Sequence, residues 1–336
     1  MSNARKLADN LPSVGQLSGR NIIINGGMTI AQRQVQSTNA ADGYRTLDRF
    51  FHELKNATDN LTYTTEQVTD APSGFSKSLK LTVTTAESAL AADEFGRIYY
   101  VAEGQDLQRI GYGTSACKEV TLSFYVKSSI TGNFSASIYL AASGGVISSQ
   151  AYTINSANTW ERKTLTFPTY TTANVPNTNA AGMYLNFGLF AGSNYNTLSP
   201  TFIAHTGAHL LGGQAANFTA VNGTTWQLTG VQLETGSQSS PFEHEPVGVT
   251  LSKCQRYYFG PSIRVHMNSA NSNNWNNADF VFPTQMRATP TMTAITNAGS
   301  CTLYATGVYT QNGQGLHIYS STQGAHYVEF TADAEL

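Results

Sequence analysis

Charged side chains are scarce in this sequence. Asp, Glu, Lys and Arg make up 12% of the 336 residues, against roughly a quarter in an average soluble protein. The 19 Lys and Arg residues are spread along the chain, and the formal net charge is −2. Because no basic stripe is present to neutralise phosphates, we expect no nucleic-acid partner.

Long apolar runs and closely spaced cysteines are also lacking. No stretch approaches the roughly 18 apolar residues of a membrane-spanning helix, and residues 1–17 have no apolar core of a secretion signal. Cys117, Cys254 and Cys301 are odd in number and far apart, which argues against a disulfide framework and a four-ligand metal site. We therefore expect no membrane insertion, no metal, no cofactor and reduced thiols.

Small polar and aromatic residues are plentiful instead. The chain has 29 Gly, 17 Tyr and 16 Phe residues, a composition typical of a β-rich extracellular or particle-surface protein. Its length exceeds one average domain and favours two.

Apolar residues alternate with polar ones from Asn21 onward, which predicts strands with one buried face. In residues 120–128, Val120, Leu122, Phe124 and Val126 face one way. Turn residues separate the segments, so the pattern predicts an antiparallel sandwich. The other segments with this pattern are 79–84, 97–101, 137–141, 163–167, 183–190 and 226–234.

The first twenty residues show a different pattern. Ser2 is a possible N-cap, Leu7 and Leu11 fall on one side of a helix, and Pro12 ends it. A segment this short does not fold alone, so we expect Leu7 and Leu11 to dock the chain onto another protein.

Five stretches, in this order, carry a resemblance to a known family. They are NIIINGGMTIAQR (21–33), YRTLDRFF (44–51), VTLSFYVKSS (120–129), TWERKTLTF (159–167) and GVQLETGSQSSPFEHE (230–245). Together they resemble the jelly-roll module of tailed-bacteriophage fibre proteins, which is similar to carbohydrate-binding modules of the galactose-binding-like type. The stretch 202–218 does not fit the pattern, and its role stays open.

Further stretches extend the resemblance to the rest of the chain. CQRYYF (254–259), FPTQMRATPT (282–291) and YVEFTADAEL (327–336) resemble the small β domain that ends many phage tail fibres, and MSNARKLAD resembles the amino ends of marine-phage virion proteins. The resemblance implies an all-β chain with a short N-terminal helix. Its parts are a virion-docking segment (1–20), an antiparallel jelly-roll sandwich (21–246) and a smaller C-terminal β-sandwich (247–336).

The stretch QLETGSQSSPFEHE (232–245) is expected to form a rigid joint between the two β domains. Val231 and Leu233 would point inward, and Phe242 would fold back over the sandwich, which stabilises it by about 1.5 to 3 kcal/mol if the ring is fully buried. His244 lies between two glutamates but has no third spaced ligand, so we expect it to be held by hydrogen bonds or charge.

Catalytic patterns are weak in this sequence. HELKN (52–56) starts like a zinc-protease motif, but Asn56 stands where the second His is needed. Asp93 and Glu94 are adjacent, so on a strand they would point to opposite faces, and they fit turn acids better than a glycosidase pair. We expect no enzyme.

Aromatic residues in polar stretches are the expected ligand contacts, because sugar rings stack on aromatic faces. Trp160 and Trp226 fall in strand contexts and are assigned to packing. Tyr195, in GSNYNTLSP, and Trp275, in NSANSNNWNNAD, lack apolar neighbours and are predicted to bind a glycan, the alternative being an ordinary loop anchor.

The resemblance implies a virion structural protein, a tail fibre or capsid appendage that contributes to attachment to host polysaccharide. Fibres of this kind are usually homotrimers, and Met286 and Met292 are expected to supply an exposed apolar surface shared between chains. Two alternatives stay open: a purely structural particle component that binds no sugar, and a glycan-degrading fibre enzyme.

Overall fold

The computed structural model describes residues 19–38, 42–55, 61–269, 276–298, 302–304, 315–320 and 324–336. The chain forms two compact units, which are described separately. The first contains Met1–Thr29 and Gln36–His244, and the second contains Ile30–Val35 and Glu245–Leu336. The expected N-terminal helix, with Leu7 and Leu11, lies outside the described residues, and so does Trp275.

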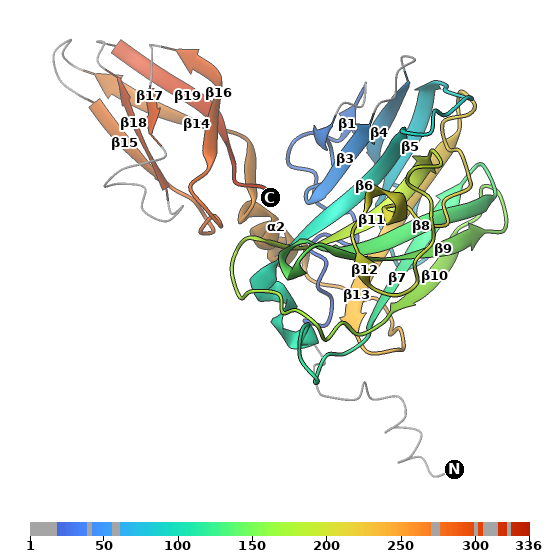
Figure 1. Ribbon diagram of the computed structural model, residues 1–336. Helices are drawn as coiled ribbons and strands as arrows, with labels where there is room; N and C mark the ends of the chain where they lie inside the picture. The colour runs from blue at the N-terminus through green and yellow to red at the C-terminus, as the bar shows by residue number, and fades with distance from the viewer. Residues whose placement is uncertain are drawn as a thin grey trace. The chain divides into compact units, whose positions relative to one another are not determined.

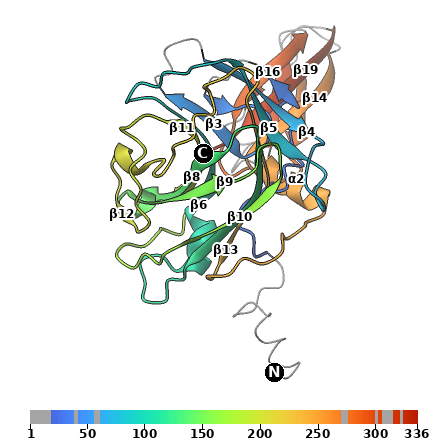
Figure 2. The same cartoon turned by 90° about the vertical axis from the view of Figure 1, so that its right-hand side faces the viewer.

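Two antiparallel sheets make up the first unit (Figure 1, Figure 2). In spatial order, the six-stranded sheet contains β1 (Gln36–Ser37), β4 (Thr62–Val68), β5 (Ser78–Thr85), β13 (Thr225–Thr235), β7 (Val120–Ser128) and β10 (Glu161–Phe167). The seven-stranded sheet contains β12 (Ile203–Ala204), β9 (Val146–Ile154), β8 (Gly132–Leu140), β11 (Ala181–Ala191), β6 (Phe95–Glu103), β3 (Phe50–Lys55) and β2 (Gly43–Tyr44). Most connections from β5 to β13 cross between the sheets, and the predicted jelly-roll sandwich is confirmed.

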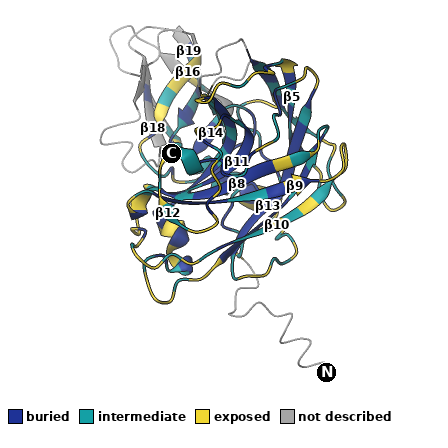
Figure 3. Cartoon of the chain, turned by 45° about the vertical axis from the view of Figure 1, so that its right-hand side comes forward, coloured by how far each residue is buried: buried dark blue, intermediate teal, exposed yellow. Residues whose placement is uncertain are grey.

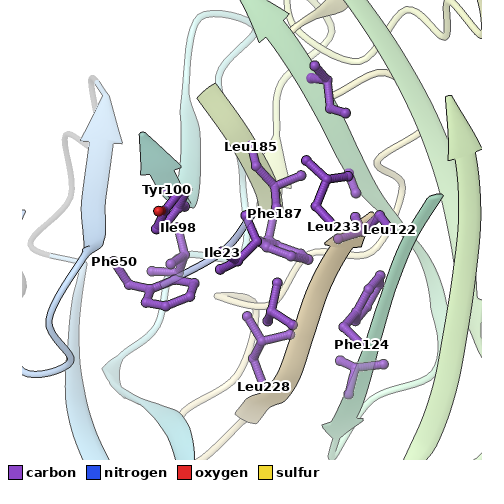
Figure 4. Close-up of a cluster of buried hydrophobic side chains, with 14 of the residues drawn as sticks. Ile23, Phe50, Ile98, Tyr100, Leu122, Phe124, Leu185, Phe187, Leu228 and Leu233 are labelled. Atoms are coloured by element: carbon purple, nitrogen blue, oxygen red, sulfur yellow. The ribbon is translucent and has the colours of Figure 1, made fainter. Parts of the chain in front are cut away.

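The inner faces of both sheets supply one apolar core. In β7 the core-facing residues are as predicted, since Val120, Leu122, Phe124 and Val126 are fully buried, but Thr121 and Ser123 between them are buried as well. The ring of Phe124 meets that of Phe187 from β11 edge to face at 5.2 Å between centroids (Figure 4). Figure 3 shows the same contrast along the chain, with buried residues on the strands and exposed ones mainly on the loops.

The stretch that follows Asn21 departs from the prediction, because residues 21–35 form turns and irregular chain and no strand begins before Gln36 in the described part. Ile22 still donates its N–H to the Leu233 carbonyl at 3.0 Å, and Val231 donates to the Gly26 carbonyl at 2.9 Å. Residues 22–26 therefore lie along β13 without forming a regular ladder.

Two three-stranded antiparallel sheets make up the second unit. One contains β14 (Tyr258–Ser269), β19 (Gly324–Asp333) and β16 (Thr291–Ala298), and the other contains β15 (Asn276–Val281), β18 (Gly315–Ser320) and β17 (Thr302–Tyr304). Side chains of both sheets, among them Phe259, Ile318 and Phe330, form one buried cluster. The predicted smaller C-terminal β-sandwich is confirmed.

Met286 and Met292 correct an expectation about this unit. Met286 is only 1% exposed and belongs to the core of the unit, and Met292 packs partly buried against the same cluster. The expectation that these two methionines form an exposed apolar surface is therefore wrong, because their side chains pack against the core of their own unit.

A short helix, α2 (Val247–Gln255), precedes β14 and was not anticipated from the sequence. The stretch 254–259 looks strand-like throughout, but Cys254 and Gln255 end this helix and only Tyr258 begins the strand. The Ile30–Val35 segment packs within the same unit: Gln32 donates to the Tyr258 carbonyl at 2.7 Å, and the Arg33 guanidinium lies 3.7 Å from the centre of the Tyr258 ring.

Candidate functional site: an aromatic row across one sheet

The outer face of the seven-stranded sheet carries aromatic side chains where a half-buried strand usually has polar ones. In β6, Ile98 and Tyr100 belong to the core, so Tyr99 between them points to the other face. By the same alternation, Tyr184 of β11 points outward next to the core residue Leu185. We call six side chains the aromatic row: Tyr44, Phe51, Tyr99, Tyr184, Tyr139 and His205.

Strand register brings these rings together. Tyr44 pairs with Phe51 across β2 and β3, Phe51 with Tyr99 across β3 and β6, and Tyr184 with Tyr139 across β11 and β8. Because neighbouring strands lie about 4.8 Å apart, each ring reaches the next. The row therefore runs across the strands.

Successive ring centroids of the row are 4.5 to 5.7 Å apart. Phe51 and Tyr99 are stacked at 4.7 Å, whereas Tyr44 meets Phe51 edge to face at 5.1 Å. At the other end, the His205 ring lies 4.5 Å from that of Tyr139. All six side chains are only partly buried, so part of each ring faces solvent.

A polar network crosses the middle of the row. The Arg97 guanidinium lies 4.6 Å from the centre of the Tyr99 ring and forms an ion pair with Glu53. Arg97 Nη1 also donates to Asn186 Oδ1 at 2.7 Å, and Asn186 Nδ2 donates to Ser137 Oγ at 3.0 Å. These bonds fix the Arg97 side chain beside the rings.

Burial sets the protonation states of this face. It raises the pKa of both Tyr99 and Tyr184, so their hydroxyls stay protonated at neutral pH and can donate hydrogen bonds. Burial, with the charges of Arg97 and His209, lowers the pKa of His205. The imidazole of His205 is therefore neutral at pH 7.

Residues 192–216, here called the covering loop, lie over the outer face beside the row. Ser135 Oγ of β8 donates to the Gly212 carbonyl at 2.9 Å, and Ser137 Oγ donates to that of Leu210 at 2.7 Å. The loop also carries His205. The stretch 202–218, whose role was open, thus largely serves to cover β8 and to position the last ring of the row.

Tyr195 belongs to the covering loop and anchors it on β6. Its side chain is 9% exposed, and its ring packs edge to face on Phe95 at 4.7 Å between centroids. The same cluster includes Leu210 and Leu211. The burial of Tyr195 agrees with the alternative of a loop anchor, and a glycan contact of this ring stays a prediction.

The two other tryptophans lie in strand surroundings. Trp226 is fully buried in the core, as expected. Trp160 is half-buried beside the six-stranded sheet, where its indole N–H donates to Asp70 Oδ1 at 3.2 Å and Lys127 Nζ lies 5.9 Å from its ring centre. This tryptophan is thus held by a polar cluster outside the core.

The sequence features considered for metal binding or catalysis have structural roles. His52 lies in β3, as the strand context predicted, and its Nδ1 is 3.4 Å from the Tyr63 hydroxyl. Glu94 Oε2 accepts the N–H of Ala91 at 2.7 Å in the turn before β6. Within the described ranges, no group of His, Cys, Asp and Glu side chains could hold a metal ion.

The stretch that was expected to form a joint, up to His244, packs within the first unit through ring contacts. Val231 and Leu233 are fully buried, as predicted. Phe242 folds back onto the Phe75 ring at 5.0 Å, and the His244 ring lies 5.2 Å from that of Phe75. His244 is therefore held by ring contacts.

In the part of the chain that the structure describes, no helix is long and apolar enough to span a membrane.

Sequence reasoning missed the aromatic row because it looked for aromatic residues in polar loops. The signal was present within the predicted strands. In 97–101, 137–141 and 183–190 the outward positions, where polar residues are usual, hold Tyr99, Tyr139 and Tyr184. Only the sheet order shows that these positions are neighbours.

No protein-family profile and no curated protein matches the sequence significantly. The chain is similar in structure to the enzymatically active domain of bacteriophage CBA120 tailspike protein 4, with 16% identity, a TM-score of 0.32 and a match that covers 64% of this chain and 21% of that one. It is similar to the family 11 carbohydrate-binding module of a Clostridium thermocellum cellulase (10% identity, TM-score 0.31, 60% and 97% covered). It is also similar to a putative sugar-binding protein from Bacteroides thetaiotaomicron (13% identity, TM-score 0.35, 64% and 99% covered).

Proposed function

We propose that this chain is a non-enzymatic virion protein of a tailed bacteriophage, a fibre or capsid appendage that binds glycans through the aromatic row. The observation that carries the glycan-binding part is the row itself: six partly exposed rings in successive contact across the outer face of one sheet. The phage assignment rests on the ordered sequence motifs.

The row has the chemistry that a sugar chain needs. Sugar rings present apolar C–H faces that pack on aromatic rings, and the row offers partly exposed aromatic rings whose centroids lie 4.5 to 5.7 Å apart. The main core lies on the other side of the sheet, and of the row only Tyr139 packs against the smaller buried cluster under the covering loop. An exposed apolar patch of this kind usually serves binding.

Hydrogen-bonding groups lie beside the rings. The protonated hydroxyls of Tyr99 and Tyr184 can donate to sugar oxygens, and the neutral His205 can both donate and accept. The Arg97 side chain is already fixed by Glu53 and Asn186, so little conformational entropy is lost when a ligand contacts it. The face is therefore preorganised for a ligand with many hydroxyls.

Attachment to a host surface does not require a tight single site. The proposed homotrimer would present three rows, and several appendages on one particle would raise the effective affinity through multivalency. We therefore expect weak binding by one chain and strong binding by the assembled particle.

The direct test is a screen of the intact chain against bacterial surface polysaccharides, repeated with Tyr184→Ala. The matched control is Tyr125→Ala, which removes a partly buried tyrosine from the six-stranded sheet, where its ring contacts Phe75 at 5.4 Å. We expect Tyr184→Ala to lower affinity at least about tenfold and Tyr125→Ala to leave it unchanged. Equal loss in both variants, or no glycan bound by the wild type, would favour the purely structural alternative.

A second readout separates binding from cleavage. The glycan that binds is incubated with the protein, and new reducing ends are measured. We expect none, because glycoside hydrolysis needs two suitably spaced carboxyl groups and Glu53 on this face is engaged by Arg97. Release of reducing ends would establish the enzyme alternative.

A further inference from the structure

A pocket lies between two connections of the first unit. Its volume is about 190 Å³, and it is lined by Leu107, Gln108, Gly111, Tyr112, Thr114, Asn174 and Val175. One wall is the 3-10 helix η1 (Gly104–Ile110) after β6 with the turn that follows it, and the other belongs to the connection between β10 and β11 (Figure 1). None of the lining residues belongs to the aromatic row.

Hydrogen bonds hold the two walls together. Gln108 Nε2 donates to the Gly104 carbonyl of its own wall at 2.9 Å and to the Val175 carbonyl of the other at 3.0 Å. Gly113 has a φ of +81°, and a Cβ there would lie 2.2 Å from the Asn174 nitrogen. Only glycine allows this close approach, so the pocket is preformed.

The lining combines an apolar floor with a polar rim. Leu107, Tyr112 and Val175 are at most 5% exposed, whereas Gln108 and Asn174 are exposed. No charged side chain lines the pocket. An ionic ligand would therefore lose its hydration without gaining a counter-charge, and the lining favours a neutral ligand with both an apolar and a polar side.

Several polar groups of the pocket are uncommitted. The Tyr112 hydroxyl is buried and has no hydrogen-bond partner within the described part of the chain. Among the same residues, neither the Asn174 side-chain amide nor Gln108 Oε1 takes part in a hydrogen bond. The Tyr112 hydroxyl is closed off from solvent, so the side chains of Gln108 and Asn174 are the groups that a ligand in the pocket can bond to.

We propose that this pocket binds a single neutral sugar unit, at a site separate from the aromatic row. Its volume equals that of about six waters at roughly 30 Å³ each and is smaller than the roughly 300 Å³ at which pockets for drug-sized ligands begin. One pyranose ring fits this space, its C–H face on Leu107 and Val175 and its hydroxyls toward Gln108 and Asn174. A terminal or branching residue of a glycan has this form.

The test is an NMR titration of the intact ¹⁵N-labelled chain with glucose, galactose, mannose, rhamnose and N-acetylglucosamine, each alone, and with glucuronate as the charged comparison. We expect at least one neutral sugar, and not glucuronate, to shift the side-chain amide signals of Gln108 and Asn174 in a saturable way. Asn174→Ala should weaken that binding roughly three- to tenfold. The exposed Asn177, which does not line the pocket, gives the control Asn177→Ala, with unchanged affinity.

Tyr112→Phe keeps the ring and removes only the hydroxyl. Because the hydroxyl has no partner within the described chain and is closed off from solvent, this variant should keep or raise the melting temperature and leave sugar affinity unchanged, which makes it a second control. Unchanged affinity in Asn174→Ala would overturn the proposal, as would the absence of any saturable shift. Shifts confined to the aromatic row would overturn it too, while supporting the proposed function.

Discussion

Phe51 and Tyr99 stack face to face across β3 and β6, with ring centroids 4.7 Å apart and planes 18° from parallel. The faces that the two rings turn to each other are covered, so the pair presents ring edges to solvent within the aromatic row, next to Arg97. Tyr99→Ala removes one ring of the pair, so we expect glycan affinity to fall at least about tenfold.

Tyr99→Phe separates the ring from the hydroxyl. We expect a smaller loss of affinity, roughly two- to tenfold, because a single hydrogen bond contributes about 0.5 to 1.5 kcal/mol. Calorimetric titration of both variants with the same oligosaccharide measures the difference. If Tyr99→Ala and Tyr99→Phe bind the oligosaccharide equally well, the Tyr99 ring does not contact the ligand.

Arg97→Lys tests whether the fixed guanidinium matters beyond its charge. Lysine keeps one positive charge but lacks the planar group that bonds Glu53 and Asn186 together. We expect a several-fold loss of glycan affinity with a change in unfolding free energy of about 1 kcal/mol or less. The control is Arg162→Lys on the edge strand β10, where the guanidinium also bonds two neighbours. A similar loss of affinity in the control would argue against a specific role for Arg97.

The NGG motif within NIIINGGMTIAQR (21–33) contains Gly26, whose position requires glycine. A Cβ at Gly26 would lie 2.0 Å from the Val231 carbonyl oxygen, whereas one at Gly27 would be in ordinary contact with the Phe242 ring, at 3.7 Å, and with Thr29, at 4.0 Å. Gly26→Ala should therefore destabilise the first unit by about 1 to 3 kcal/mol through overpacking. Gly27→Ala should have little effect in the same urea titration. Equal stability of the two variants would contradict this account of the motif.

His52 makes stability depend on pH. Burial, and to a lesser degree the charge of Arg45, lowers its pKa from 6.5 to about 3. A histidine with a depressed pKa in the folded state is protonated preferentially in the unfolded chain, so stability is full above about pH 6.5 and falls as the pH drops toward 3. At about pH 4.5 the loss from His52 alone is roughly 2 to 3 kcal/mol.

The measurement for His52 is urea unfolding at pH 7.5 and 4.5, on the wild type and on His52→Gln. Glutamine still offers a hydrogen-bond partner to Tyr63 but does not titrate. The difference in unfolding free energy between the two pH values should shrink in the variant. An unchanged difference would assign the acid sensitivity to other groups.

The proposed homotrimer predicts a particle of three times 36.2 kDa in light scattering. Met286 cannot supply the shared surface, because it is buried within the chain. Val281 and Ile295 of the second unit are 75% and 55% exposed and are the residues we would change to glutamate. A single-chain mass for the wild type at micromolar concentration would contradict the trimer.

The sequence was sufficient to predict the strands because their pattern is local. Alternation within 120–128 reports the core face, and β7 buries Val120, Leu122, Phe124 and Val126 as predicted, although Thr121 and Ser123 on the other face are buried as well. The first stretch, 21–35, was misjudged because its apolar run at residues 22–24 follows a turn-rich path along β13 and forms no strand. Helix α2 was missed because the aromatic residues that follow it made 254–259 look like one strand.

The candidate site was harder to predict because it depends on sheet order. Phe51 and Tyr99 are far apart in the sequence, and only the pairing of β3 with β6 makes them neighbours. Tyr195 looked exposed because its sequence neighbours are polar, yet its packing partners, Phe95 and Leu211, come from elsewhere. A single sequence carries no direct record of such contacts.

The Ile30–Val35 segment has a consequence for how the chain can be divided. Because it belongs to the second unit, the main part of the first unit is inserted into the second in sequence, and a cut at residue 245 does not yield two complete pieces. A fragment of residues 245–336 would lack the side chain that lies over the Tyr258 ring and pairs with Asp333 at 3.1 Å. During synthesis, Gln32 and Arg33 leave the ribosome more than two hundred residues before their partners. The second unit is therefore completed after the first, although Ile30–Val35 are made before most of the first unit.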